Sequence, residues 1–549
     1  MNPSSSEFKS QKKITLQELQ EHDGVKSPRL WTCIYDHVYD LTEFAAVHPG
    51  GEEMIKSACA RDATALFESY HLSSNAIAKS YLDINHKGKS IKYVGEFDVE
   101  SAKVSNSSDQ LPNDAAIKFT FQSPLDSEKP QKKRNIYELM KQRIREQLLK
   151  KSDFKSRIRK VDGLRLINAV FIIAGLIICQ LASQYIPSLP LVIAVALGTL
   201  AGLFHHLTMV HILHDVGHGS FTNNARFWNW FGTFGSYILG QSFFCWTIRH
   251  NVAHHVYTNM SELDPDVGVY EWNRYLEVTN TNSTTIVPAT AKNINSDKAA
   301  DDENAVSKMY GEPKNYKSVP VNIMAKTGSF SSLPLLYASL IFYMQLVDFI
   351  HYWTRHVSEG ITFASSTFSW TTFHFYISKI VFVIYRVILP GYLFYKTGGV
   401  IGRPTFEALL AFVATEVVAG VMFGFLSQIN HISEKCAWPS NVLNEMVENS
   451  SGVNDDLDWA EIQVRTCIDY CHDSYLWTYL SGFLNYQVIH HLFPGVNPWL
   501  YPQLLPIVKQ VCKENNVPYT IYNNFKDALE SHVRQLTLFS KKQLLKNTL

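Results

Sequence analysis

The sequence lacks an excess of charge of either sign. Its 549 residues contain 50 Lys and Arg against 50 Asp and Glu, and the mean hydropathy is −0.08. Such a composition is that of an ordinary soluble protein, and it gives no reason to expect a nucleic-acid partner. The average is misleading, because residues 1–160 are polar whereas long apolar runs begin at Leu166.

Several motifs are also missing. The eight cysteines are scattered, with no Cys-x-x-Cys pair, as expected in reducing surroundings. No Gly-x-Gly-x-x-Gly fingerprint is present, so the sequence predicts no dinucleotide site of that kind. Residues 1–13 are polar and lack the apolar core of a signal peptide, so no signal peptide is expected. There is no internal repeat.

The apolar runs predict four membrane spans. Each is long enough to cross a hydrocarbon core of about 30 Å at about 1.5 Å per residue. A fifth run, Leu333–Trp353, contains Gln345, Asp348 and His351, so we expect an interfacial helix there. An even number of crossings also keeps the histidine clusters described below on one side. The four expected spans are Leu166–Gln184, Leu189–Leu213, Tyr376–Tyr395 and Thr405–Leu426.

Charge predicts the orientation of these spans. Residues 132–160, directly before the first span, contain twelve Lys and Arg against three acidic residues. The positive-inside rule places this flank in the cytosol, together with both termini and the histidine clusters. The sequon at Asn282 should then remain unmodified. Two polar segments, 279–316 and 101–133, are expected to be a flexible insertion and a flexible tether.

The N-terminal module contains its own motif. Strand-like runs precede His48-Pro-Gly-Gly51, and Asp62-Ala-Thr64 and His71 follow. Residues 13–98 resemble the cytochrome b5 family, which implies that His48 and His71 are the axial ligands of a haem b. Two protein ligands saturate the iron, so such a haem transfers electrons. The family's usual glycine before Asp-Ala-Thr is Ala60 or Arg61 here, which would alter a turn. The alternative interpretation is a turn with an incidental histidine.

Three histidine clusters, spread over nearly 280 residues, follow apolar runs. Histidines four apart project from one face of a helix, and an adjacent histidine points about 100° away. Imidazole is a suitable ligand for iron, copper and zinc. The clusters contain more imidazole nitrogens than one ion can bind, so two metals are expected. The clusters are His214-x-x-x-His218, His250-x-x-x-His254-His255 and Gln487-x-x-His490-His491.

The histidines also have other interpretations. One isolated pair would best be explained as polar residues near the headgroups, but three clusters together favour function. Soluble di-iron bundles use Glu-x-x-His instead, and the one such motif here, Glu68 to His71, belongs to the haem module. The lone histidines are expected to be structural; these are His205, His206, His211, His351, His356 and His374.

The clusters, their order and the fused haem module resemble the front-end fatty acid desaturases. A third box that begins with Gln487 is a mark of that group, and Asp458–Val464 also fits it. His431, at the end of the last span, resembles a further metal ligand of membrane desaturases. The resemblance implies that the metal ligands are His214, His218, His250, His254, His255, His431, Gln487, His490 and His491, which apart from His431 are also the expected catalytic residues.

The resemblance also implies the chemistry. Two non-haem irons and O2 would remove hydrogens from adjacent methylenes of a fatty acyl lipid. The electrons would come from NADH through a separate cytochrome b5 reductase and the haem. The second box has three residues between His250 and the pair His254-His255, and this spacing resembles that of delta-5 and delta-4 acyl desaturases. In delta-6 acyl and delta-8 sphingolipid relatives the box is more often shorter. Residues 231–246 are candidates for lining an acyl tunnel.

The expected fold is an N-terminal α+β cytochrome b5-like haem domain, residues 13–98, joined to an all-α membrane domain, residues 161–535. Residues 99–160 would be a flexible and then basic linker, and the membrane domain would carry four transmembrane helices, interfacial helices and a cytosolic di-iron cap. The family and topology imply the endoplasmic reticulum. The alternatives are a sphingolipid long-chain-base delta-8 desaturase, a hydroxylase or acetylenase, and a catalytically silent membrane haem carrier.

Overall fold

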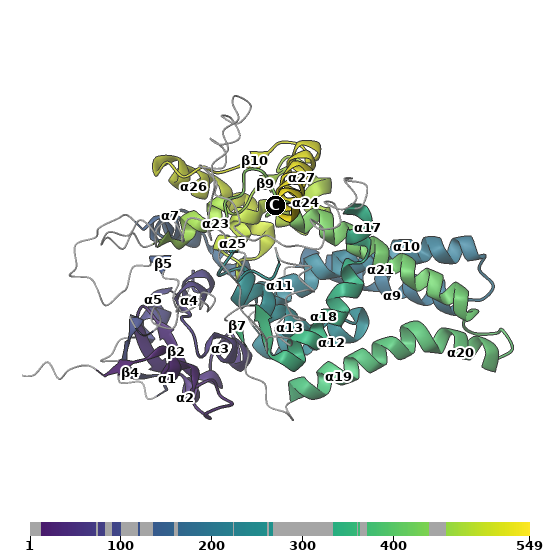
Figure 1. Cartoon of the computed structure of the whole chain (residues 1–549), viewed down its shortest axis with the longest axis horizontal. Helices are drawn as coiled ribbons and strands as arrows, with labels where there is room; N and C mark the ends of the chain where they lie inside the picture. Colours follow the sequence, from purple (N-terminus) through teal and green to yellow (C-terminus); the bar gives the residue numbers. More distant parts are fainter. Residues whose placement is uncertain are drawn as a thin grey trace, which may run out of the picture.

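The computed structural model describes most of the chain. The described residues are 12–72, 75–82, 90–99, 101, 119–120, 135–158, 163–222, 224–260, 263–266, 333–358, 361–362, 370–438 and 457–548. The expected insertion at 279–316, with its sequon, lies outside them, as does nearly all of the expected tether at 101–133. Figure 1 shows a small α+β unit beside a larger helical unit.

The small unit is built on a four-stranded sheet of order β1-β4-β3-β2. Strands β2 and β3 form an antiparallel hairpin, and its turn residues Tyr35 and Asp36 both have positive φ, as a two-residue hairpin turn requires. Ala60 has a φ of 63°, so the turn that usually contains glycine is kept, with alanine in the left-handed region. The elements are β1 Lys13–Ile14, α1 Leu16–Gln20, β2 Trp31–Ile34, β3 His37–Asp40, α2 Thr42–Ala45, α3 Glu52–Ala58, α4 Thr64–Tyr70, α5 Asn75–Tyr81 and β4 Lys92–Phe97.

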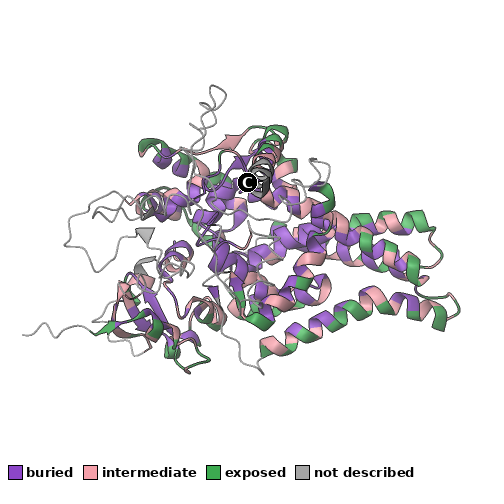
Figure 2. Ribbon diagram, in the orientation of Figure 1, coloured by how far each residue is buried: buried purple, intermediate pink, exposed green. Residues whose placement is uncertain are grey.

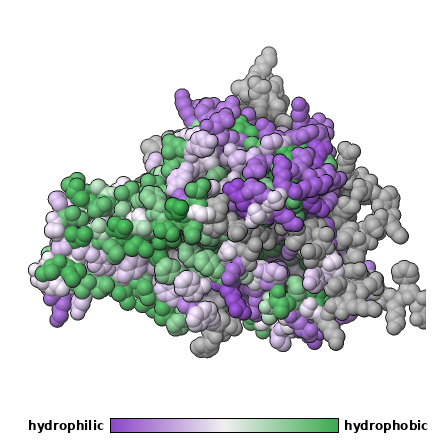
Figure 3. All heavy atoms as spheres, turned by 180° about the vertical axis from the view of Figure 1, so that it is seen from behind, coloured by the Kyte–Doolittle hydropathy of each residue, from purple (hydrophilic) through white to green (hydrophobic). Residues whose placement is uncertain are grey.

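Four candidate membrane spans confirm the number and positions expected from the sequence. They are Gly163–Tyr185 (α9), Leu191–Gly217, Trp370–Lys396 and Thr405–Gln428 (α21). The second joins α10 (Leu191–Thr208), η3 (Met209–Leu213) and α11 (His214–Gly217), and the third joins α19 (Trp370–Val383), η6 (Ile384–Ile388) and α20 (Leu389–Lys396). Large apolar side chains such as Phe171, Val192 and Phe406 are exposed on these helices. Figure 3 shows hydrophobic residues over this end and hydrophilic residues at the opposite end, which makes the chain an integral membrane protein.

The segment expected to be interfacial forms two helices, α17 (Leu333–Ala338) and α18 (Leu340–Thr354). Neither is among the four candidate spans. Its polar residues are bound by other protein groups: Asp348 pairs with Lys379 at 2.5 Å, and Gln345 donates to the carbonyl of Leu239 at 3.0 Å. The polar side chains of this segment therefore bind groups of α12 (Ala225–Leu239) and α19.

The remaining elements form a helical cap over one end of the spans. Much of the basic stretch before the first span is helical here, and Tyr137, Met140 and Phe154 are buried in the largest core of the described residues. Figure 2 shows that buried residues gather in the middle of the molecule, whereas exposed residues are frequent at the far ends of the spans. Cap elements are α7 Ile136–Ile144, η2 Arg145–Leu149, α8 Ser152–Arg157, α12 Ala225–Leu239, α13 Phe243–Thr247, η4 Ile248–His254, α23 Trp459–Arg465, α24 Tyr475–Leu480, η7 Leu484–Tyr486, α25 Gln487–Leu492, η8 Pro498–Leu500, α26 Tyr501–Glu514 and α27 Phe525–Thr548. Short strand pairs join β5 Phe119–Thr120 to β8 Leu457–Asp458, β6 His356–Ser358 to β7 Ile361–Thr362, and β9 Asp469–Tyr470 to β10 Ile521–Tyr522.

Helices α10 and α21 approach each other closely through glycine. A Cβ on Gly198 would lie 2.5 Å from the carbonyl oxygen of Ala411, and one on Gly202 would lie 2.5 Å from that of Thr415. Small residues at such positions let membrane helices pack backbone to backbone.

Replacing Gly198 by alanine should therefore force these helices apart. We expect Gly198→Ala to lower the stability by about 1–3 kcal/mol, the usual cost of overpacking. Gly163→Ala is the matched control, since a Cβ there meets nothing within 4 Å. Thermal unfolding in detergent measures the difference, and equal stability of the two variants would contradict the close contact.

Candidate functional site

His48 and His71 face each other in the small unit. Their ring centroids are 6.3 Å apart. Nδ1 of His71 donates to the carbonyl of Phe67 at 2.6 Å, and Nδ1 of His48 lies 3.3 Å from that of Gly51. A proton on Nδ1 puts the ring's lone pair on Nε2, the atom that would bind a metal. A Cβ on Gly50 would lie 2.6 Å from the His48 ring, which explains the glycine after Pro49. The pair fits the two axial positions of one haem iron.

The three histidine boxes converge although they lie on separate elements. The first lies at the end of the second span, on α11 and its C-cap His218, the second begins on η4, and the third lies on α25. The spacing of the second box was expected on an α-helix, but η4 is a π-helix, in which the amide of His255 donates to the carbonyl of His250. The wider turn brings residues four and five apart to the same face, so His254 and His255 both contribute. Such π-helical turns are frequent at functional sites.

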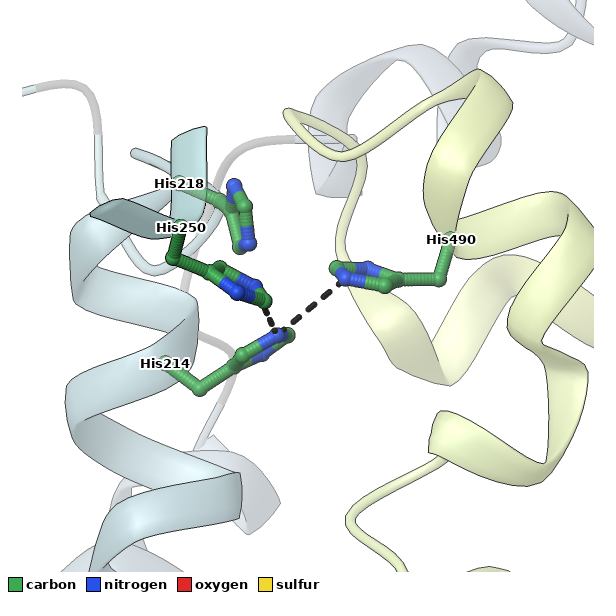
Figure 4. Close-up of side chains that lie close together, drawn as sticks. All are labelled: His214, His218, His250 and His490. Atoms are coloured by element: carbon green, nitrogen blue, oxygen red, sulfur yellow. Dashed lines mark hydrogen bonds between the residues drawn. The ribbon is translucent and has the colours of Figure 1, made fainter. Parts of the chain in front are cut away.

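One group of imidazoles consists of His214, His218, His250 and His490. Their candidate ligand atoms lie within 4.8 Å of one another, and all four residues are buried. Figure 4 shows His490 facing the other three from the opposite element. Nε2 of His214 is 3.2 Å from Nε2 of His490 and 3.3 Å from that of His250. Nitrogen lone pairs that converge in this way suit one cation between them.

A second group consists of His254, His431 and His491. The side-chain amide of Gln487 lies between two of them, with its nitrogen 2.8 Å from Nε2 of His431 and 3.1 Å from Nε2 of His491. Exchanging the amide nitrogen and oxygen of Gln487 would turn an oxygen toward this group. His255 lies between the groups, within reach of His490 and His491. Two adjacent groups could hold two metal ions.

The outward-facing nitrogens of four box histidines have their own partners, whereas Nδ1 of His214 and of His255 is buried without a hydrogen-bond partner. Nδ1 of His254 donates to Asp264 at 3.0 Å, and Nδ1 of His250 lies 3.3 Å from Asp266. Nδ1 of His490 lies 3.2 Å from the hydroxyl of Tyr501, and Nδ1 of His491 lies 2.9 Å from the amide oxygen of Gln463. A proton held on Nδ1 leaves the Nε2 lone pair directed inward, which is the tautomer that binds metal.

The sequence did not predict the roles of Asp264, Asp266 and Gln463, although Gln463 lies in the segment Asp458–Val464 named above. It had no signal for Tyr501 at all. The lone histidines His206 and His211 bond to the carbonyls of Leu480 and Tyr479, each at 2.7 Å.

Burial keeps most of these rings neutral. It lowers the pKa of His218, His255, His431, His490 and His491 well below the ordinary value, and neighbouring histidines lower it further. Neutral imidazole is the form that binds metal. Burial alone would also lower the pKa of His254, but the carboxylate of Asp264 raises it above the usual value.

An apolar cavity of about 80 Å³ lies against both groups of histidines. Trp246 forms part of its wall and stacks on His250, with ring centroids 4.7 Å apart. Glycine at 217 makes room for this indole, because a Cβ there would lie 2.2 Å from the Trp246 ring. A larger cavity of about 520 Å³ shares Ser236, Ser242 and Phe243 with the first. The expected tunnel segment 231–246 thus lines both cavities.

Asp264 offers a direct test of the metal site. Asp264→Asn removes the negative charge that polarises His254, so metal affinity should fall about 10- to 100-fold, as for other changes behind metal ligands. Metal content per chain after dialysis against a weak chelator measures the change. Asp153→Asn, on the exposed side of α8, should retain the metal of the unaltered chain. Equal metal in both variants would contradict the role of Asp264.

Comparisons with known proteins agree with this geometry. Residues 15–95 match the family described as cytochrome b5-like haem/steroid binding domain, and residues 188–284 and 320–523 match the fatty acid desaturase family. The chain is 27% identical to Delta(5) fatty acid desaturase A of Dictyostelium discoideum, over 96% of this chain and 93% of that protein. It is also 27% identical to the acyl-lipid (8-3)-desaturase of Mortierella alpina, over 96% of each, and 28% identical to that of Physcomitrium patens, over 96% and 91%. The desaturase match covers more than half of the residues, so the chain belongs to the fatty acid desaturase family and carries a cytochrome b5-like domain at its N-terminus.

Proposed function

We propose that this chain is a front-end acyl desaturase that places a cis double bond on the carboxyl side of existing ones, at the delta-5 position. The observation that carries the proposal is the apolar cavity whose wall contains His214, His250 and His254. A chain of methylenes held there lies beside both groups of candidate ligands. The names of the relatives, Delta(5) and (8-3) desaturases, favour this position.

The residues that would hold two irons are those expected from the sequence: His214 and the three imidazoles around it form one group, and His254, His431 and His491, with Gln487, form the other. His255 would bridge them. Bound iron would supply the oxidant that removes hydrogen from unactivated carbon. The protein positions the ligands, keeps the rings neutral through burial, and excludes water with apolar side chains such as Met344 and Phe423.

The balance of the reaction explains the fused haem module. One double bond removes two hydrogens from the acyl chain, and reduction of O2 to two waters needs two more electrons and two protons. A haem carries one electron at a time, so a haem held by His48 and His71 would transfer two electrons, one after the other, for each double bond. NADH acting through a separate cytochrome b5 reductase is the proposed source, since no dinucleotide fingerprint is present in the sequence.

We place the cap on the cytosolic face of the endoplasmic reticulum. The basic stretch 132–160, which contains α7 and α8, joins the first span at the same end of the molecule as the histidine groups (Figure 1). Positive charge beside a span favours the cytosolic side, and the reductase and its NADH would be available there.

The test of the activity is expression in yeast that lacks polyunsaturated fatty acids, with a panel of C18 to C22 polyunsaturated acids supplied. We expect a new double bond at delta-5, located by mass spectrometry. His490→Ala should abolish the product, because it removes an imidazole that faces His214. His356→Ala, an exposed histidine on β6, is the matched control and should retain it.

Each other outcome selects another function. A new unsaturation in sphingoid bases alone would reassign the chain to the long-chain-base desaturases. Oxygen in the acyl product would indicate a hydroxylase. Haem without further iron in the purified protein, and no product in either lipid pool, would favour an electron carrier.

Removing a haem ligand separates the two modules. We expect His71→Ala to lose the haem absorption band and the double-bond product while the chain keeps its non-haem iron, because His71 is remote from both histidine groups in the sequence and belongs to neither. Absorption spectra and iron content measure this. A variant that keeps the product without haem would contradict the role of the module.

A further inference from the structure

The haem module contacts the first histidine box directly. Tyr70, the last residue of α4, has its hydroxyl oxygen 2.7 Å from Nδ1 of His218. The two rings are inclined by 27°, with centroids 6.2 Å apart. Tyr70 immediately precedes His71, which is assigned to the haem. A single residue of the module therefore stands between a haem ligand and a member of the metal cluster.

The chemistry of His218 decides which atom donates in this contact. Nε2 of His218 is buried without a hydrogen-bond partner, and the residue belongs to the group around His214. An imidazole that offers Nε2 to a metal carries its proton on Nδ1. Nδ1–H therefore donates and the Tyr70 oxygen accepts. Tyr70 has the same relation to His218 as Asp264 has to His254, but it comes from the other module.

Other contacts hold α4 in place independently of Tyr70. The carboxylate of Glu68 is buried and binds Lys141 of α7, and Lys79 lies 3.0 Å from it. Tyr137 of α7 donates to the carbonyl of Leu492 at 2.6 Å, beside the third box. The module should therefore remain docked when the Tyr70 hydroxyl alone is removed.

We propose that Tyr70 is a positioning residue shared by the two modules. Its oxygen aims Nε2 of His218 into the metal cluster, and its backbone joins that contact covalently to His71. His71, Tyr70 and His218 then form one connection from haem ligand to metal ligand, made of covalent bonds and one hydrogen bond. This inference rests on the proposed function for the use of the connection, whereas the orienting role concerns metal retention alone.

The experiment uses the full chain with the substitution Tyr70→Phe, which keeps the ring and removes the oxygen. We expect haem content and the haem spectrum to stay unchanged. Release of non-haem iron to ferrozine should become about tenfold faster, the lower range for loss of a group behind a metal ligand. Reoxidation of reduced haem by O2 in the presence of acyl substrate should slow at least tenfold per iron-loaded chain. Tyr70→Gln, whose amide oxygen can accept the same bond, should restore iron retention.

Tyr137→Phe is the matched control, because it removes another hydroxyl at the same interface. We expect its iron release and haem reoxidation to stay within twofold of the unaltered chain. Equal effects of Tyr137→Phe and Tyr70→Phe would mean that the hydroxyls serve docking only, and unchanged iron release in Tyr70→Phe would also overturn the proposal. Iron release needs no substrate, so an unaltered chain that forms no double bond would refute the proposed function and leave this test intact.

Discussion

The structure depends on keeping a group of neutral imidazoles in one buried volume. Rings such as His218, His490 and His491 are almost inaccessible to water, and burial holds their pKa values far below the ordinary value. When Nδ1 of each ring carries the proton, the facing Nε2 atoms, about 3 Å apart, direct lone pairs at each other. No hydrogen then lies between them to form a hydrogen bond. A cation between such lone pairs would be bound by several of them at once, so the cluster suits a metal.

Many cap residues hold the imidazoles in position from outside the cluster. The outward nitrogens are bound by carboxylates at 264 and 266, by the amide of Gln463 and by the hydroxyl of Tyr501. The first span is tied to the first box by a buried ion pair between Arg165 and Asp215. An ion pair at that depth is costly unless it is well bound, and Arg165 also donates to the carbonyl of Ser220 at 3.0 Å. The spans are thus positioned by the groups that support the metal site.

The haem module joins the same arrangement. Helix α4 is connected to α7 by Glu68 and Lys141, and α7 is connected to the third box by Tyr137. The stretch expected to be a linker therefore also forms the surface on which the module docks. Electrons that leave the module need not cross solvent. A donor fused to its acceptor gains a high effective concentration from the tether, and here the docking contacts add a defined orientation.

The sequence by itself indicated what depends on local spacing, because length, polarity and residue spacing encode it: the four spans, the cytochrome b5-like module with the expected pair His48 and His71, and the boxes at His214, His250 and His490. Segment 333–353 was also separated correctly from the spans, although its polar residues turned out to bind Lys379 and a main-chain carbonyl. Only the tertiary structure decided which residue contacts the outward nitrogen of a candidate ligand. His218 and Tyr70 are 148 residues apart, and such a pair has no local signature. The π-helical turn at His250 likewise has no local signature, because a spacing of four residues is equally compatible with an α-helix.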